Sequence, residues 1–420
     1  MYPPLPLKLV EVRGDEGIIE TGGERYPVNL HFLDNVLPGD NILVQMGFGI
    51  QPSGLQKTTG SKNPSVINLR TEIENVLSGT EFTVLLTSGL QIANLRLHKI
   101  LYSLPPYLHF VYGPGCPTCL TPAGYYRDVF QLAQKESVIL VTFNDVMNMP
   151  TTEGTLQSLR MAGNDVRLVH SPYDVLRIAE WNPSREVVLA AVGYDIMTAT
   201  VGVTLKEAVE RDIKNVSFFL SLQKRDVLLR DFILHTSHPV DGVIFSAYDV
   251  AAAGINSYDF IVRELERACS CAGFTAEDVL GGVLDVIRQS KSKELVMQQG
   301  ASCICSASGN PRIRSAINDV FMLSDARWAT DEIVKQSRYM LRDTYRSFDA
   351  ERKFNIQPDT SLTMPGCNSR EIQLGLKIPS ECPNFANGCT PAHPVGPGML
   401  TTDGLCNSWY HSSIKVKNVF

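Results

Sequence analysis

Hydrophobic and polar positions change their pattern twice along the chain. Residues 1–52 contain four short runs in which apolar and polar residues mix, bounded by Gly, Asp and Pro: LKLVEVRG, EGIIETGG, ERYPVNLHFL and DNILVQMGFGI. Runs of this kind, recurring about every ten residues, predict short strands. We expect residues 1–52 to form a small OB-like β-barrel. Residues 53–65 are polar and rich in turn-forming residues, which is typical of a linker.

After residue 65 the pattern is that of buried strands alternating with helices. Five continuous apolar runs occur, at residues 137–145, 165–172, 186–193, 215–222 and 241–247. Such runs predict strands that are covered on both faces, and helix-length segments lie between them. This alternation predicts an α/β fold with mainly parallel sheet. We expect two packed α/β halves, residues 66–182 and 183–312.

The last part of the chain, residues 313–420, follows neither pattern. Residues 333–354, IVKQSRYMLRDTYRSFDAERKF, have a composition that favours a helix. A tail rich in Gly, Pro and Cys comes after them and is expected to be mainly loops. We therefore expect residues 313–420 to form a helical and cysteine-rich region.

Composition narrows the range of functions. The 420 residues carry a net charge of −6, which argues against a protein that binds nucleic acid regardless of sequence. No run of 18 or more apolar residues occurs, so no transmembrane helix is expected. The N-terminal residues lack the layout of a secretory signal, so we expect a cytoplasmic location. In that compartment, ten cysteines indicate metal binding, redox chemistry or core packing more than structural disulfides.

Cys116 and Cys119 stand two residues apart, between glycines and prolines, in YGPGCPTCLTP. The segment TPAGYYRDVFQLAQ is expected to form a helix that Thr121 caps, with Pro122 in its first turn. Cys119 then lies beside a helix N-terminus, where free amides and the helix dipole lower the pKa of a thiol. These features favour a redox or catalytic pair. The alternatives are a structural turn and half of a zinc site, although no second pair follows at a typical zinc spacing.

Four further cysteines, Cys367, Cys382, Cys389 and Cys406, lie in the tail. Loops can bring several sulfurs to one point, and four thiolates suit either zinc or an iron–sulfur cluster. His393 could replace one of them. Four unrelated buried thiols are the alternative, but cysteines are dense here while apolar residues are few.

Three acids, Asp145, Asp195 and Asp249, each follow a predicted strand. Ligands bind at the carboxyl edge of the sheet in open α/β folds. Each acid taken alone is nevertheless expected to be a solvated loop residue. The glycines of GPGCPTC and GGVLDV do not fit a phosphate-binding motif.

Read together, these stretches resemble hydrogenase maturation proteins over nearly the whole chain. Residues 1–52 are similar to the small barrel family HypC, including its PGD.ILV..GF.IQ ending. From residue 66 the chain resembles HypD. GPGCPTCLTP is the most specific stretch, and VTFNDVMNMP, NPRIRSAINDVF and CPNFANGCTPAHPVGPGM follow in the same order. The chain therefore looks like a HypC–HypD fusion.

The resemblance implies a metal function. In that family HypC and HypD form a complex that carries iron, with cyanide and carbon monoxide ligands, for nickel–iron hydrogenases. HypD also holds a 4Fe-4S cluster in its C-terminal region and a redox-active thiol pair. By resemblance, Cys367, Cys382 and Cys389 match three cluster ligands. The fourth ligand of the family lies where this chain has residues 360–363, and Cys406 is the candidate replacement; zinc is the alternative metal.

The chain also departs from the family pattern. Tyr2 stands where HypC begins Met-Cys, and Ser88, in SGLQ, stands where HypD has Cys-Gly-Thr-His. Both missing cysteines hold the iron in that family, and a hydroxyl is too hard a ligand to replace a thiolate on low-spin iron. Two further stretches differ. Gly-Phe-Glu-Thr-Thr reads GYDIM at residues 193–197, and the Gly-His loop reads SAYD at residues 246–249.

From these observations we expect a diverged HypC–HypD-type iron–sulfur redox scaffold. Its dithiol, Cys116 and Cys119, exchanges electrons with a cluster in the tail, and its partner is a maturation-type protein. The first alternative is an iron–sulfur and dithiol enzyme that acts on a small-molecule substrate in a specialised biosynthetic pathway. The second is an inactive paralogue that binds partners. We expect neither nucleic acid nor a membrane as a partner, and the sequence leaves open whether the chain is an enzyme.

Overall fold

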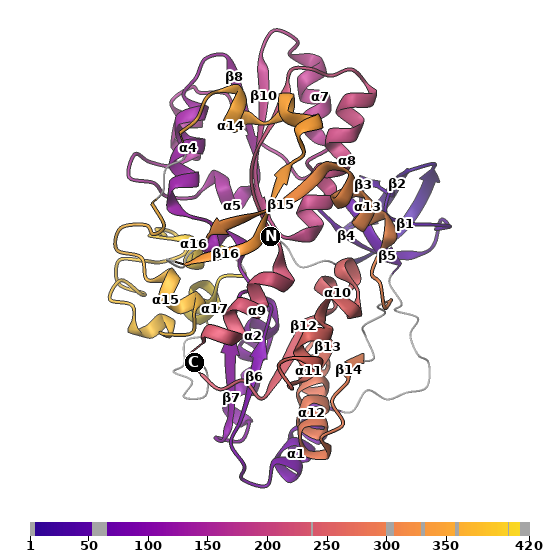
Figure 1. The fold of residues 1–420 in the computed structure, drawn as a ribbon, viewed down its shortest axis with the longest axis vertical. Helices are drawn as coiled ribbons and strands as arrows, with labels where there is room; N and C mark the ends of the chain where they lie inside the picture. Colours follow the sequence, from indigo (N-terminus) through magenta and orange to yellow (C-terminus); the bar gives the residue numbers. More distant parts are fainter. Residues whose placement is uncertain are drawn as a thin grey trace.

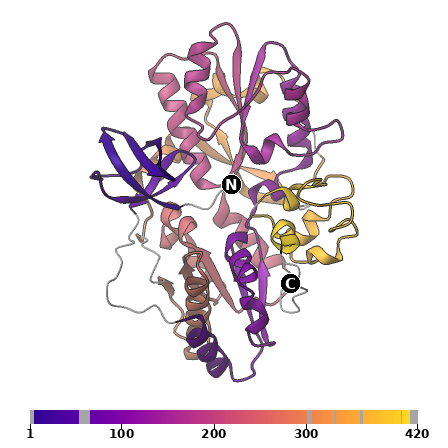
Figure 2. The same ribbon diagram turned by 180° about the vertical axis from the view of Figure 1, so that it is seen from behind.

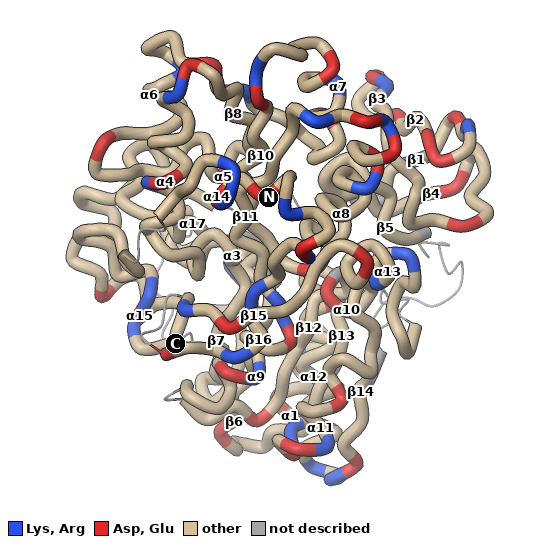
Figure 3. Tube along the Cα trace, turned by 45° about the horizontal axis from the view of Figure 1, so that its top comes forward, with Lys and Arg blue, Asp and Glu red and all other residues tan. Residues whose placement is uncertain are grey.

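The computed structural model describes residues 5–52, 65–236, 238–299, 306–328, 332–357, 361–401 and 403–411. Three sheets organise these residues: a closed five-stranded barrel, a five-stranded sheet and a six-stranded sheet. The two open sheets lie at opposite ends of the molecule, with the barrel against one side of their junction and the cysteine-rich tail against the other (Figures 1 and 2). Acidic and basic residues lie side by side over both halves (Figure 3).

The barrel confirms the prediction for the N-terminal residues. Its strands are β1 (Leu5–Arg13), β2 (Glu16–Thr21), β3 (Glu24–Asn29), β4 (Asn41–Gln45) and β5 (Phe48–Pro52), closed in the order β1-β2-β3-β5-β4. Leu9, Leu30 and Ile42 fill the interior. A side chain at Gly17 would meet the ends of the Leu9 and Leu30 side chains, which would have to shift to make room. The expected linker lies outside the described residues except for Ser65, which caps α1 (Val66–Leu77).

The five-stranded sheet is parallel throughout and has the order β14-β13-β12-β6-β7. Its strands are β6 (Phe82–Leu86), β7 (Leu108–Tyr112), β12 (Gly242–Ser246), β13 (Ala268–Ala272) and β14 (Met297–Gln299). Helices α1, α2 (Gly89–Leu97) and α12 (Ala276–Ser292) cover one face. Helices α9 (Arg225–His235), α10 (Ala247–Ala253) and α11 (Asp259–Arg263) cover the other. Burial on both faces explains why these strands read as continuous apolar runs.

The six-stranded sheet has the order β15-β16-β11-β10-β8-β9. Strands β8 (Val138–Thr142), β9 (Val166–Leu168), β10 (Glu186–Gly193) and β11 (Val216–Gln223) are parallel. The antiparallel hairpin of β15 (Phe321–Arg327) and β16 (Ile333–Leu341) extends the sheet beside β11. Helices α4 (Ala123–Ala133) and α6 (Leu156–Met161) pack on one face. Helices α7 (Asp174–Trp181), α8 (Asp195–Glu210) and α13 (Pro311–Val320) pack on the other.

The remaining elements are short. They are η1 (Ile100–Ser103), α3 (Pro117–Leu120), α5 (Asn144–Met147), η2 (Ile255–Tyr258), η3 (Asp343–Phe348), α14 (Ala350–Lys353), α15 (Ser369–Gln373), η4 (Pro379–Glu381), α16 (Pro397–Leu400) and α17 (Leu405–His411). Among the residues that the structure describes, no helix is long and apolar enough to cross a membrane.

Two expectations need correction. The boundary expected between residues 182 and 183 does not separate the sheets, because the chain builds β6 and β7 in one sheet, β8 to β11 in the other, and then returns to the first for β12 to β14. Residues 333–354 are not one helix: β16 comes first, and η3 and α14 follow. Pairing of β16 with β11 and β15 satisfies its backbone groups and overrides its helical composition.

The barrel is seated on the six-stranded half. Phe32, Phe48 and Ile50 of the barrel segment share one hydrophobic core with helices α8 and α13. Asn310 caps α13, with its Oδ1 accepting from the backbone N–H of Arg312 at 2.9 Å and of Ile313 at 3.3 Å. Its Nδ2 donates to two barrel carbonyls, Phe32 at 2.8 Å and Ile50 at 3.3 Å. One side chain therefore both starts a helix and holds the barrel.

Asn310→Asp should separate these two roles. Aspartate caps a helix as well as asparagine does, but it cannot donate to the two barrel carbonyls. We expect a loss of about 2 kcal/mol in unfolding free energy, because a carboxylate then faces two carbonyls. Hydrogen exchange should quicken in the barrel and not in α13. Asn310→Ala, which loses the cap as well but brings no charge against the carbonyls, should quicken exchange in α13 as well as in the barrel. Wild-type stability and exchange in Asn310→Asp would show that these bonds do not hold the barrel.

Candidate functional site

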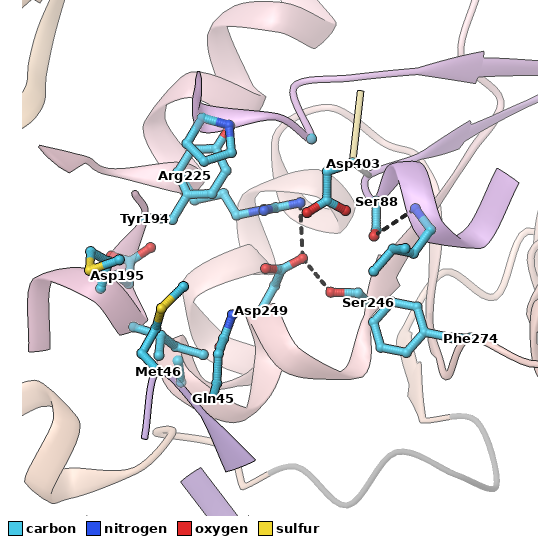
Figure 4. Close-up of a pocket in the computed structure, with 16 residues that line it drawn as sticks. Gln45, Met46, Ser88, Tyr194, Asp195, Arg225, Ser246, Asp249, Phe274 and Asp403 are labelled. Carbon is cyan, nitrogen blue, oxygen red and sulfur yellow. Dashed lines mark hydrogen bonds and ion pairs between the residues drawn. The ribbon is translucent and has the colours of Figure 1, made fainter. Parts of the chain in front are cut away.

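A cavity of about 80 Å³ lies where both open sheets meet the barrel and the tail. Most of its wall comes from residues that directly follow strands: Ser88 after β6, Gly115 after β7, Tyr194 to Met197 after β10, Arg225 after β11, and Ser246 and Asp249 at the end of β12 and in α10. Gln45 and Met46 of the barrel and Asp403 of the tail complete it (Figure 4). This is the carboxyl edge at which open α/β sheets bind ligands.

A buried ion pair crosses this cavity. Arg225 Nη2 lies 3.0 Å from Asp249 Oδ2, and the two side chains are 7% and 12% exposed. The same nitrogen donates to the carbonyl of Thr87, and the guanidinium stacks 4.6 Å from the ring centre of Tyr194. Ser246 Oγ donates to Asp249 at 2.6 Å, so Asp249 lies between Arg225 and Ser246 (Figure 4). The pair links segments that follow strands of both sheets.

The other acids of the cavity hold their protons more tightly than exposed carboxyls do. Burial raises the pKa of Asp403 to about 6, and the charges of Asp145 and Asp249 add to the effect. Burial also raises the pKa of Asp195, whose Oδ1 accepts a 2.5 Å hydrogen bond from Tyr339. The cavity therefore contains a fixed cation and buried carboxyls whose pKa values lie above the usual range.

The tail is docked against the five-stranded half beside the cavity. Tyr112 Oη, at the end of β7, donates to the carbonyl of Asp403 at 2.5 Å. A side chain at Gly89 would collide with the backbone of Asp403, so the glycine that starts α2 permits this approach. Trp409 of α17 stacks on Arg96 of α2, with 3.8 Å between the guanidinium and the ring centre. These contacts bring a residue of the far C-terminal region into the central cavity.

Cys116 and Cys119 form a disulfide at the edge of the same cavity. Both are buried, with 0% and 3% exposure, while their neighbours Gly115 and Pro117 line the cavity wall. The glycines of this stretch are required by close packing. Gly113 has a φ of +138°, and a side chain at Gly115 would collide with the ring of Tyr112.

The expected capping of the helix after the dithiol is wrong. Cys119 lies inside the short helix α3, Cys116 precedes this helix, and α4 begins only at Ala123 without a side-chain cap. The hydroxyl of Thr121 instead donates to the carbonyl of Pro117 at 3.0 Å. Because Pro117 opens a separate turn, the chain forms α3 before α4, and it is Cys116 whose sulfur accepts a backbone N–H, that of Cys119 at 3.1 Å.

The dithiol touches the tail directly. Cys116 Sγ lies 3.4 Å from Thr401 Oγ1, although 285 residues separate them. Thr401 is 2% exposed and follows α16, with its N–H bonded to Pro397 and its carbonyl accepting from Gly404. Thr401 therefore joins the dithiol to the segment that leads to Cys406.

The four tail cysteines lie near one another but are not drawn tightly together. Burial raises the pKa of Cys367 and Cys406, and in each case the neighbouring thiols raise it further. Backbone N–H groups reach two of the sulfurs, from Ser369 to Cys367 at 3.4 Å and from Val395 to Cys389 at 3.3 Å. Over the described ranges, no three His, Cys, Asp or Glu side chains converge closely enough to hold a single metal ion.

The expected acids divide between the cavity and its surroundings. Asp195 and Asp249 line the cavity, so their interpretation as solvated loop acids is wrong; Asp145 is half-buried outside its wall. Sequence reasoning missed Arg225 and Asp403. Arg225 could have been found, since it lies directly after a predicted strand. Asp403 carries no such signal, because its place depends on docking of the tail. Tyr2 lies outside the described residues.

The described residues form an α/β protein of two halves with an N-terminal barrel, a buried Cys116–Cys119 disulfide and a cysteine-rich tail. The chain belongs to the HypD family: residues 65–413 match HypD, described as the hydrogenase formation hypA family. Residues 4–52 match the HupF/HypC family. The resemblance drawn from the sequence is thus confirmed.

The sequences of individual relatives align with most of this chain. The hydrogenase maturation factor HypD of Escherichia coli (strain K12) is 31% identical over 73% of this chain and 83% of its own length. HypD of Rhizobium leguminosarum bv. viciae is 30% identical over 75% and 84%, respectively. HypD of Cupriavidus necator is 29% identical over 73% and 83%. The stretches SGLQ, GYDIM and SAYD, in which we expect this chain to depart from the HypD pattern, all contribute residues to the wall of the central cavity.

Asp403→Asn should change the pH dependence of stability. Since the pKa of about 6 in the folded state exceeds that of an exposed aspartate, the stability that Asp403 contributes is complete below about pH 4 and is lost as the pH rises through about 6. The variant keeps the side-chain size and has no charge to bury. We expect it to match the wild type near pH 4 and to exceed it by about 2 kcal/mol at pH 7. Urea unfolding across this range measures the difference, and a difference independent of pH would contradict the assignment.

Proposed function

We propose that this protein is a redox scaffold of the HypC–HypD type, acting with a protein partner in hydrogenase maturation or in a related assembly of a metal centre. Its relatives are named hydrogenase maturation factors, which supports the maturation role. Its working parts are the Cys116–Cys119 dithiol, the four tail cysteines and the central cavity. The dithiol stores two electrons, and burial of both sulfurs shields them from oxidants in solution.

One observation carries the proposal: Cys116 Sγ contacts Thr401 Oγ1 at 3.4 Å. Electron and thiol exchange both require short distances, and this contact joins the dithiol to the cysteine-rich tail. The cavity wall continues from Pro117, beside Cys116, to Asp403, two residues beyond Thr401. The three working parts therefore share one junction in the fold.

Cys367, Cys382, Cys389 and Cys406 are the residues that would hold a 4Fe-4S cluster. Their chemistry fits, because thiolates are the usual ligands of such clusters and N–H groups directed at the sulfurs tune them. A cluster spreads its thiolates over several irons, so they stand farther apart than the ligands of one zinc ion. The thiols of the described tail lie near one another, and the match to HypD supports the cluster over zinc. When bound, the cluster supplies single electrons.

A residue of the cavity wall supports the proposal that this chain no longer carries iron through thiolate ligands. Ser88 stands where the HypD pattern has an iron-binding cysteine, and its Oγ accepts a hydrogen bond from the N–H of Leu90 at 3.3 Å. A serine hydroxyl in this position caps α2 and is a poor ligand for low-spin iron. We therefore propose that the chain keeps the dithiol chemistry of its family and has lost thiolate-based iron carriage.

A small-molecule enzyme is the second candidate. The cavity offers a buried guanidinium at Arg225 and carboxyls at Asp249 and Asp403, groups that can orient a small polar substrate beside the dithiol. A catalytically inactive paralogue is less well supported. Buried charges destabilise a protein that has no use for them.

The tail cysteines can be tested by metal analysis. Protein purified without oxygen should be brown and carry about four irons and four sulfides per chain. Alanine at Cys367, Cys382 or Cys389 should abolish the colour, while Cys406→Ala should weaken it. Cys269→Ala is the matched control, since Cys269 is a buried core thiol of β13. Stoichiometric zinc without sulfide, or a cluster that survives the first three changes, would refute the assignment.

The proposed loss of iron carriage can be tested by complementation. A strain that lacks its own HypC and HypD should regain no hydrogenase activity when this chain is supplied, because Tyr2 and Ser88 replace both iron-binding cysteines. The strain's own two proteins, expressed from the same vector, are the positive control, and an immunoblot checks the level of this chain. Restored activity would show that the two thiolates are dispensable.

A further inference from the structure

The two sulfurs of the dithiol have unequal surroundings. Cys116 Sγ receives the backbone N–H of Cys119 at 3.1 Å and lies 3.4 Å from the hydroxyl of Thr401. Among the residues that the structure describes, no hydrogen-bond donor reaches Cys119 Sγ. Hydrogen bonds to a charged sulfur are stronger than those to a neutral one. The difference therefore matters most after the disulfide opens, when one sulfur carries a negative charge.

Thr401 is held in place to act on Cys116. Its N–H is bonded to Pro397, and its carbonyl accepts from Gly404, so the backbone is fixed on both sides of the side chain. The side chain is 2% exposed, so no bulk water competes for its hydroxyl. In a buried site of this kind a single hydroxyl stabilises a thiolate more than it does at the surface.

We propose that Thr401 is a positioning residue that makes Cys116 the thiolate of the reduced pair. This inference rests on the proposed redox function of the dithiol. It corrects the expectation that Cys119 is the thiol with the lowered pKa, which depended on a helix start at Thr121 that the fold does not have. It also assigns a tail residue to the chemistry of the dithiol.

The reductive step balances as follows. An external dithiol reductant gives two electrons, the sulfur–sulfur bond of Cys116 and Cys119 breaks, and the reductant forms its own disulfide. Of the two protons that the reductant loses, one goes to Cys119 and the other to solvent. Cys116 keeps the negative charge, and the O–H of Thr401 and the N–H of Cys119 both donate to it. In the disulfide neither sulfur carries a charge, so Thr401 favours the reduced state.

Thr401→Val tests the hydroxyl with little change of shape, and Thr401→Ser restores it. Full-length protein is equilibrated with mixtures of reduced and oxidised dithiothreitol from about pH 5 to pH 9, quenched with acid, unfolded, alkylated and weighed by mass spectrometry. Above the pKa of Cys116, Thr401→Val should be about tenfold harder to reduce than the wild type. Thr401→Ser should stay within about threefold. At lower pH, where Cys116 is neutral, the three proteins should converge.

Thr121→Val is the matched control. It removes another buried threonine hydroxyl beside α3, one that bonds Pro117 and Ser221 and neither sulfur. It should leave the pH dependence of the equilibrium unchanged. An effect of Thr401→Val that is the same at every pH, or a Thr401→Ser variant that behaves like Thr401→Val, would overturn the inference, since either result indicates packing alone.

A second measurement separates this inference from the proposed function. In Cys119→Ser no disulfide can form with Cys116, so the pH midpoint for alkylation of Cys116 by iodoacetamide reports its pKa directly. Adding Thr401→Val should raise that midpoint by about one pH unit. An unchanged midpoint would refute the role of Thr401, whatever the redox data show. If instead the midpoint shifts while the wild-type pair stays oxidised or reduced in every dithiothreitol mixture, the redox function fails and the role of Thr401 stands.

Discussion

The buried ion pair between Arg225 and Asp249 is the interaction on which the central arrangement depends. Arg225 lies two residues after β11 of the six-stranded sheet, and Asp249 lies in α10, three residues after β12 of the five-stranded sheet. Removing one partner would leave an uncompensated charge in the interior, at a cost of about 3–5 kcal/mol. The pair therefore fixes the two carboxyl edges relative to each other. The cavity, the dithiol loop after β7 and Asp403 all lie at that junction.

The fold was predictable from the sequence where local pattern and final burial agree. The five apolar runs became β8 to β12, because parallel strands covered on both faces need apolar side chains on both. The hairpin of β15 and β16 was missed, since pairing with β11, more than a hundred residues earlier in the chain, decides its structure. The double crossing between sheets was also missed. Strand order depends on packing between distant segments, so it cannot be predicted from the spacing of the strands along the chain.

The site residues also divide into those that the sequence indicated and those that only the fold brings together. Cys116 and Cys119 were singled out by their spacing, whereas Asp249 was noted after a strand but interpreted as a solvated loop acid. Thr401 and Asp403 were beyond sequence reasoning because they reach the junction only through docking of the tail. That docking needs the hydroxyl of Tyr112 and the missing side chain of Gly89. A contact between residues that lie nearly three hundred positions apart produces no periodic pattern in the sequence, so the sequence alone does not predict it.

The donors to Cys116 and most of the residues that line the cavity are different groups. Cys116 has two hydrogen-bond partners, the N–H of Cys119 and the hydroxyl of Thr401, and neither belongs to the stretches in which we expect a departure from the HypD pattern. Those stretches line the cavity beside Arg225, and one of them also contacts the dithiol loop, since Tyr194 Oη donates to the carbonyl of Pro114 at 3.0 Å. A new cavity lining would therefore keep both donors to Cys116 but would alter a contact of the loop that carries it. We infer that the contents of the cavity can change only as far as the new lining still supports this loop.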